Sequence, residues 1–133
     1  MENSPAVRAR RFKVVAVDDE RDLLNLIRLW LGPQCDVVCL ASGEDLVNQL
    51  LRIGPDLVIM DLHMPGENGF DLCDRLRRHA RFASLPVILL TGQIGGADPR
   101  RSAEVRATAC WRKPIRCQDF QSKVSEVLAS LPS

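Results

Sequence analysis

Residues 57–60 form a short run of apolar, β-forming side chains that ends in Asp61. Turn residues bound the run on both sides, Gly54 and Pro55 before it and Pro65 and Gly66 after it. A short apolar run between turn signals predicts a buried parallel strand. A carboxylate at the carboxyl end of such a strand opens into the crevice where open α/β sheets bind ligands. Taken alone, Asp61 fits the first residue of a loop equally well.

Length and composition are those of a globular domain. The chain has 133 residues, of which 46% are hydrophobic and 26% charged, and this suits one domain with a sizeable core. The net charge of +1 gives no support for direct binding to nucleic acid or to an anionic membrane. The apolar run at residues 14–17 is far too short for a signal or membrane segment, so we expect a cytoplasmic protein.

Residues 1–11 lack any periodicity and carry the basic side chains Arg8, Arg10 and Arg11. We expect a flexible, solvated N-terminal lead there, followed by one domain over residues 12–131. The five cysteines have no C-x-x-C spacing, their number is odd, and the two histidines lie far from any cysteine pair. This argues against a disulfide framework and against a zinc site, and predicts reduced, mostly buried thiols.

Strand and helix signals alternate along residues 12–131. Apolar, β-rich runs predict five strands, at residues 12–17, 35–40, 57–61, 86–90 and 108–112. Apolar side chains at helical spacing predict helices over residues 23–31, 46–51, 70–76 and 120–131, with a thinner pattern over residues 98–107. Gly32 and Gly54, each followed by proline, end the first two helices, and Ser42 is a candidate N-cap for the second.

Alternating strands and helices imply a parallel sheet covered on both faces. Five such units in about 120 residues fit the flavodoxin-like doubly wound fold, with strand order 2-1-3-4-5 and five helices. In that fold the strand ends at Asp18, Asp19, Asp61, Thr91 and Lys113 open on one edge. Clustered carboxylates repel unless protonated or neutralised by a cation, and oxygen-only ligands suit Mg²⁺. A hydroxyl and an ammonium beside them would hold a phosphoryl group in line with a carboxylate nucleophile.

These residues give the chain a specific resemblance. It resembles a response-regulator receiver domain of the two-component systems in its acidic pair after the first strand, in Asp61 followed by Met64, Pro65, Gly66 and Gly69, and in Thr91 and Lys113-Pro114. Thirty positions separate Asp61 from Thr91, and twenty-two separate Thr91 from Lys113, as is usual in the family. Each motif alone is weak, and four in order at the usual spacing are strong.

The resemblance implies a role for each matching residue. Asp61 would be the phospho-acceptor, and Mg²⁺ would be held by Asp18, Asp19, Asp61 and the backbone carbonyl of His63. Thr91 and Lys113 would contact the phosphoryl oxygens. His63 and Gln93 occupy the positions that, in the family, tune the access of water to the phosphoryl group. The implied partners are a sensor histidine kinase or a histidine phosphotransfer protein, with an output protein or domain that the sequence does not name.

The chain departs from the family pattern at two positions. Cys110 stands where the family usually has Tyr or Phe, and Arg106 stands where it usually has Gly, whereas the small residue after Thr91 is retained as Gly92. Cys110 is therefore the switch position without its usual aromatic ring. We expect Trp111 to fill the core between sheet and helix rather than to replace that ring.

Two other functions are open at this point. A pseudo-receiver would bind partners without phosphate, and the missing aromatic ring at Cys110 favours it slightly. An aspartyl-nucleophile phosphohydrolase would resemble D-x-D at the nucleophile, but the second position is His63 and no cap insertion is visible. We therefore expect a signalling module and not an enzyme.

Overall fold

The computed structural model describes residues 11–92 and 98–132 of the chain. Five parallel strands form one sheet in the order β2-β1-β3-β6-β7. Their bounds are β1 Phe12–Val17, β2 Cys35–Leu40, β3 Leu57–Asp61, β6 Val87–Thr91 and β7 Ala109–Arg112. Counted by themselves, the five strands follow the order 2-1-3-4-5, which confirms the predicted flavodoxin-like doubly wound fold.

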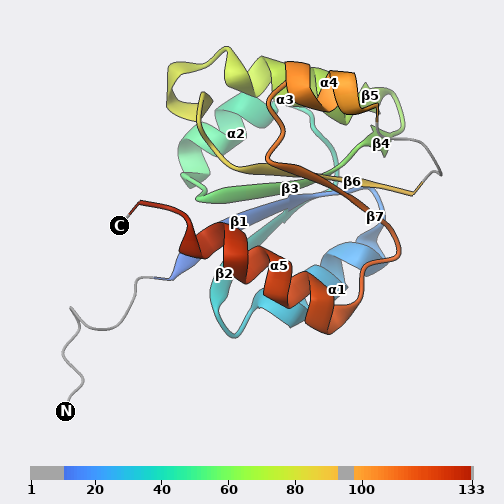
Figure 1. Cartoon of the computed structure of the whole chain (residues 1–133), viewed down its shortest axis with the longest axis vertical. Helices are drawn as coiled ribbons and strands as arrows, with labels where there is room; N and C mark the ends of the chain where they lie inside the picture. Colours follow the sequence, from blue (N-terminus) through green and yellow to red (C-terminus); the bar gives the residue numbers. More distant parts are fainter. Residues whose placement is uncertain (1–10, 93–97, 133) are drawn as a thin grey trace.

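Helices cover both faces of the sheet (Figure 1). One face carries α1 Arg21–Leu31 and α5 Cys117–Ala129, and the other carries α2 Leu46–Ile53, α3 Gly69–Arg77 and α4 Pro99–Glu104. All five lie where the sequence predicted them. The helix α4 is shorter than the predicted residues 98–107, because the backbone of Arg106 turns left-handed (φ 57°) just beyond its end.

The ends of α1 and α2 follow largely from their flanking residues. Helix α1 ends at Gly32, as predicted, and α2 ends at Gly54, whose left-handed φ of 70° suits glycine. The prediction that Ser42 caps α2 is wrong. Its hydroxyl accepts a hydrogen bond from the N–H of Glu44 (3.2 Å), so it closes a local turn, and the helix begins only at Leu46.

Two short elements interrupt what the sequence predicted as plain loop. Strands β4 His63–Met64 and β5 Glu67–Asn68 pair antiparallel directly after β3, and η1 Ala80–Phe82 forms a 3₁₀ turn after α3. Strands of two residues are too short to leave a recognisable alternation in the sequence. The side chain of Asn68 accepts a hydrogen bond from the N–H of Phe70 (2.8 Å) and so caps α3.

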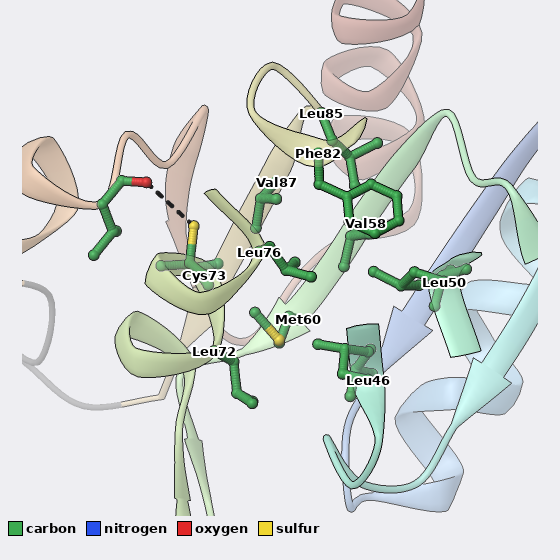
Figure 2. Close-up of a cluster of buried hydrophobic side chains, with 14 of the residues drawn as sticks. Leu46, Leu50, Val58, Met60, Leu72, Cys73, Leu76, Phe82, Leu85 and Val87 are labelled. Atoms are coloured by element: carbon green, nitrogen blue, oxygen red, sulfur yellow. Dashed lines mark hydrogen bonds between the residues drawn. The ribbon is translucent and has the colours of Figure 1, made fainter. Parts of the chain in front are cut away.

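The apolar side chains form one cluster on each face of the sheet. Alternate residues of the central strands point to opposite faces, so Val58 and Met60 join the cluster under α2 and α3, while Leu57 and Ile59 join the cluster under α1 and α5. Figure 2 shows the first cluster, where Met60 meets Leu46, Leu72 and Leu76. This packing fixes β3 at the centre of the molecule.

Cys73 lies in the first cluster and is fully buried, in agreement with the buried thiols that the sequence predicted. Its thiol donates to the carbonyl oxygen of Val105 (3.4 Å), the hydrogen bond drawn in Figure 2. Burial raises the pKa of the Cys73 thiol. The side chain therefore acts as a packing group that also touches the segment after α4.

Arg77 is a buried cation without a carboxylate partner among the described residues. Its guanidinium donates to four backbone carbonyl oxygens, those of Phe82, Leu85, Val105 and Arg106, at 2.6–3.3 Å. Backbone carbonyls can satisfy a buried cation because each offers a partial negative charge. This fixes the end of α3 to the loop before β6 and to the segment after α4.

Arg11, assigned by the sequence to the flexible lead, is held by contacts with the domain. Its Nε lies 2.8 Å from Asp36 Oδ1, and its other nitrogens donate to three backbone carbonyls at the turn from α1 into β2. Arg8 and Arg10 lie outside the described residues. Within residues 11–92 and 98–132, no helix is long and apolar enough to cross a bilayer.

Candidate functional site

Three carboxylates meet at the carboxyl edge of the sheet. Asp61 is the last residue of β3, and Asp18 and Asp19 come directly after β1, the strand beside it. One carboxylate oxygen of each residue lies within 4.8 Å of the other two. Asp18 and Asp61 are buried, whereas Asp19 is exposed. Adjacent parallel strands end at the same edge, and the strand order therefore brings these acids together as predicted.

Lys113 follows β7 and reaches into this acidic group. Its backbone N–H donates to the carbonyl oxygen of Thr91 (2.8 Å), which ties the end of β7 to the end of β6. Its Nζ lies 2.8 Å from Glu20 Oε1, 3.1 Å from Asp18 Oδ2 and 3.5 Å from Asp61 Oδ1. Its side chain is only 16% exposed. One ammonium group is thus shared by three carboxylates.

Burial dominates the electrostatics of the site. It raises the pKa of Asp18, an effect strengthened by the charge of Asp61 and opposed by hydrogen bonds from the Glu20 N–H and from Lys113. It also raises the pKa of Asp61, although Lys113 opposes the shift. For Lys113, burial lowers the pKa, but hydrogen bonds to Glu20 and Asp18 and the nearby acidic charges outweigh burial and bring the pKa to about 12. The single positive charge of Lys113 does not balance the negative charges of the surrounding carboxylates. The site therefore favours an additional cation.

Thr91 and Gly92 form the wall of the site next to Lys113. Thr91 is the last residue of β6, which pairs with β3 on one side and β7 on the other, and its side chain is buried. A Cβ atom on Gly92 would lie 3.9 Å from Lys113 Cδ, so the chain runs alongside the lysine stem. Thr91 and Lys113 therefore lie near Asp61 at the carboxyl ends of the two strands that the sequence predicted.

The β4–β5 hairpin and the start of α3 close the site behind Asp61. The backbone N–H of His63 donates to Asp61 Oδ1 (3.4 Å), while the His63 side chain is exposed. A Cβ on Gly69 would lie 2.9 Å from Leu62 Cα and 3.0 Å from the Asp61 carbonyl oxygen, closer than side chains tolerate. Glycine thus allows α3 to start against the end of β3. Gln93 lies outside the described residues.

The donor set fits a hard divalent cation. Asp18, Asp19 and Asp61 offer only oxygen atoms, which are the ligands that Mg²⁺ prefers. In an octahedral Mg²⁺ site with bonds of about 2.1 Å, opposite oxygens are roughly 4.2 Å apart. The three carboxylate oxygens all lie within 4.8 Å of one another, a limit slightly above that separation. The exposure of Asp19 leaves one side open to water, which Mg²⁺ retains in most protein sites.

The family model of the response regulator receiver domain matches residues 14–125. The match covers most of the chain and includes all the acids of the site, Thr91 and Lys113. The chain belongs to this family. Receiver domains are signalling modules of two-component systems, so the acidic site described above is the acidic pocket of a receiver.

Solved receiver structures agree with this assignment. The chemotaxis protein CheY4 of Vibrio cholerae is 23% identical, with a TM-score of 0.82 over 89% of this chain and 99% of that chain. A putative response regulator from Chloroflexus aurantiacus is 31% identical, with a TM-score of 0.80 over 90% and 99%. The signal receiver domain of a histidine kinase from Syntrophus aciditrophicus is 28% identical, with a TM-score of 0.78 over 90% and 92%. The first of these similarities supports the fold, and the second also supports the family.

In this receiver, Cys110 and Trp111 lie on opposite faces of β7. Cys110 packs against the cluster under α2 and α3, whereas Trp111 packs against the cluster under α1 and α5. The Trp111 ring meets Phe120 edge-on (6.1 Å between centroids), and Lys123 Nζ lies 5.4 Å from its centre. Trp111 therefore fills core, as predicted, and cannot supply an aromatic ring on the face of Cys110.

Glu20 belongs to the receiver's site but was not predicted from the sequence. Glu20 received no role, yet its carboxylate makes the shortest contact with Lys113. The available signal was its place directly after the acidic pair, at the start of a predicted helix. Spacing alone does not show whether a side chain at that position caps the helix or reaches across to the next loop.

Proposed function

We propose that this receiver domain accepts a phosphoryl group on Asp61 in the presence of Mg²⁺ and passes the signal on through a changed protein-interaction surface. The observation that carries the proposal is the placement of Lys113 within 3.5 Å of Asp61 in a cluster with Asp18 and Asp19. A nucleophilic carboxylate, a cation-binding acid pair and a mobile positive charge are the groups that phosphoryl transfer requires.

The donor would be a phosphohistidine on a sensor histidine kinase or a histidine phosphotransfer protein. A carboxylate oxygen of Asp61 attacks phosphorus, the phosphorus–nitrogen bond breaks, and its electron pair remains on the departing imidazole. The product is an acyl phosphate on Asp61. Lys113 and the Thr91 hydroxyl contact its phosphoryl oxygens. Mg²⁺, when bound by Asp18, Asp19, Asp61 and the His63 carbonyl, supplies further neutralisation of the phosphoryl charge.

The lifetime of the acyl phosphate depends on the water that reaches it. His63 supports this part of the proposal because its side chain is exposed two residues beyond Asp61. Gln93 takes the matching role after Thr91. Replacing both by alanine is expected to change the autodephosphorylation rate several-fold, about 1 kcal/mol in the barrier. An unchanged rate would mean that neither side chain orients or admits the attacking water.

Mass spectrometry after incubation with acetyl phosphate tests the proposal directly. We expect one phosphoryl group on the wild-type protein with Mg²⁺, and none without it or in Asp61→Asn. No uptake by the wild-type protein would favour a pseudo-receiver. Turnover of a phosphomonoester with Mg²⁺ would favour a phosphohydrolase.

A further inference from the structure

Glu20 reaches the site from the N-cap position of α1. It is the residue before the helix, with extended backbone angles (φ −85°, ψ 103°), a position where side chains often accept hydrogen bonds from the helix N-terminus. No such capping bond is formed by the Glu20 side chain. The carboxylate instead contacts Lys113, beside a groove of about 440 Å³ that both residues line.

The contacts of Lys113 are unequal. Its Nζ lies 2.8 Å from Glu20 but 3.5 Å from Asp61, so the ammonium is closer to a carboxylate outside the candidate metal cluster than to the proposed phospho-acceptor. The Glu20 side chain is 61% exposed, whereas the Asp61 side chain is 6% exposed. The contact with Glu20 therefore places the ammonium toward the solvent side of the pocket.

Phosphorylation would change this balance. An ammonium has three donors, and Lys113 already directs them toward Asp18, Glu20 and Asp61. A phosphoryl group adds negative charge and strong acceptor oxygens at Asp61. A close contact between the Lys113 Nζ and a phosphoryl oxygen would take up one of these three donors, and the Glu20 carboxylate already holds the nearest one. Glu20 and the phosphoryl group thus compete for one cation.

We infer that Glu20 is a positioning residue that holds Lys113 away from Asp61 and so weakens the phosphorylated state of the receiver. The inference rests on the proposed function, because it needs a phosphoryl group at Asp61. It assigns to Glu20 a regulatory effect on the site rather than a part in the transfer itself. The alternative is an ordinary exposed ion pair, which has little effect on its surroundings.

The test measures the affinity for beryllofluoride, a mimic of the bound phosphoryl group, at saturating Mg²⁺. Amide chemical shifts report binding and confirm that each variant is folded. In Glu20→Gln the dissociation constant is expected to fall by roughly threefold to tenfold. The control, Asp22→Asn, removes the same charge from a residue that lines the same groove but has no ion pair with Lys113 among the described residues. Its dissociation constant should change less than about twofold.

A second background separates a specific effect from a general change in charge. In Lys113→Gln, the further change Glu20→Gln should leave beryllofluoride affinity unchanged, because the group that Glu20 positions is gone. The dissociation constant for Mg²⁺ alone should be the same in wild type and Glu20→Gln, which distinguishes positioning of the lysine from metal binding.

Each result bears on one of the two claims. Unchanged or weaker binding in Glu20→Gln, an equal gain in Asp22→Asn, or a gain that persists in Lys113→Gln would overturn the role of Glu20 while the proposed function stands. If the wild-type protein binds no beryllofluoride at saturating Mg²⁺, the proposed function falls, and the role of Glu20 falls with it.

Discussion

At the scale of the residue, burial makes the ionised form of Asp61 unfavourable, so this form lowers the free energy of unfolding. Burial raises its pKa above the unfolded value of 3.8. An acid with a raised folded-state pKa binds more protons when folded, so its contribution to stability falls as the pH rises above 3.8. We expect Asp61→Asn to raise the free energy of unfolding at neutral pH, with a gain that shrinks as the pH approaches about 4. Urea denaturation across this range measures the effect, and a variant no more stable than wild type at neutral pH would contradict it.

Asp19 differs from its neighbours because it is exposed. Asp19→Ala should weaken Mg²⁺ binding by roughly tenfold or more, equivalent to at least about 1.4 kcal/mol, because it removes one of three clustered carboxylates. The free energy of unfolding should change by less than about 0.5 kcal/mol, as is usual for surface positions. Calorimetric titration and denaturation measure the two quantities. Asp22→Ala serves as the control, and equal Mg²⁺ affinity in both variants would remove Asp19 from the metal site.

At the scale of the element, the packing of α3 against β3 depends on Gly69. A methyl group there would lie within 3.0 Å of backbone atoms of Asp61 and Leu62, and backbone cannot move aside as a flexible side chain can. Gly69→Ala should therefore destabilise the domain by about 1–3 kcal/mol. In Gly92→Ala the nearest atom among the described residues, Lys113 Cδ, would lie at an ordinary 3.9 Å, so the loss should stay near 0.5 kcal/mol. Guanidinium denaturation compares the two, and equal losses would contradict the argument.

The elements whose position follows from long apolar patterns were predictable from the sequence. The five strands and five helices lie where periodicity placed them, because a buried strand or an amphipathic helix needs a run of suitable side chains. The failures concern local hydrogen bonds. Ser42 bonds to the N–H of Glu44 rather than to α2, and the β4–β5 hairpin is two residues per strand. Patterns of a few residues do not decide which of several such bonds forms.

The same limit applies within the site. Strand order made the meeting of Asp18, Asp61, Thr91 and Lys113 predictable, since each follows or ends a parallel strand. The contact of Glu20 with Lys113 depends on the directions in which two long side chains point. No periodic pattern in the sequence predicts these directions. The anchoring of Arg77 by backbone carbonyls was invisible for the same reason, because a carbonyl has no sequence signature.

At the scale of the whole molecule, α4 is held less firmly than the other four α-helices, each of which has buried residues. None of its residues is buried, and the exposed ion pair between Arg101 and Asp71 (2.8 Å) ties it to α3. Its C-terminal side is fixed through the hydrogen bonds of Arg77 to Val105 and Arg106. Few buried contacts imply low local stability, and switching motions occur in such segments.

We therefore predict that beryllofluoride with Mg²⁺ changes amide chemical shifts mainly within residues 92–106, of which 93–97 lie outside the described part of the chain. Changes at Cys110 should be small, because its side chain has one rotatable bond and cannot fill and empty a cavity as an aromatic ring can. Large changes along β7 and α5, with residues 98–106 unaffected, would contradict this route for the signal.

Locating the phosphoryl group tests the account most directly. The protein is incubated with acetyl phosphate and Mg²⁺, treated with borohydride, which reduces an acyl phosphate to an alcohol, and digested for tandem mass spectrometry. We predict that Asp61 alone is converted to homoserine, and only in samples that contained Mg²⁺. Unmodified Asp61 under these conditions, or conversion of Asp18 or Asp19 instead, would contradict the assignment of Asp61 as the phospho-acceptor.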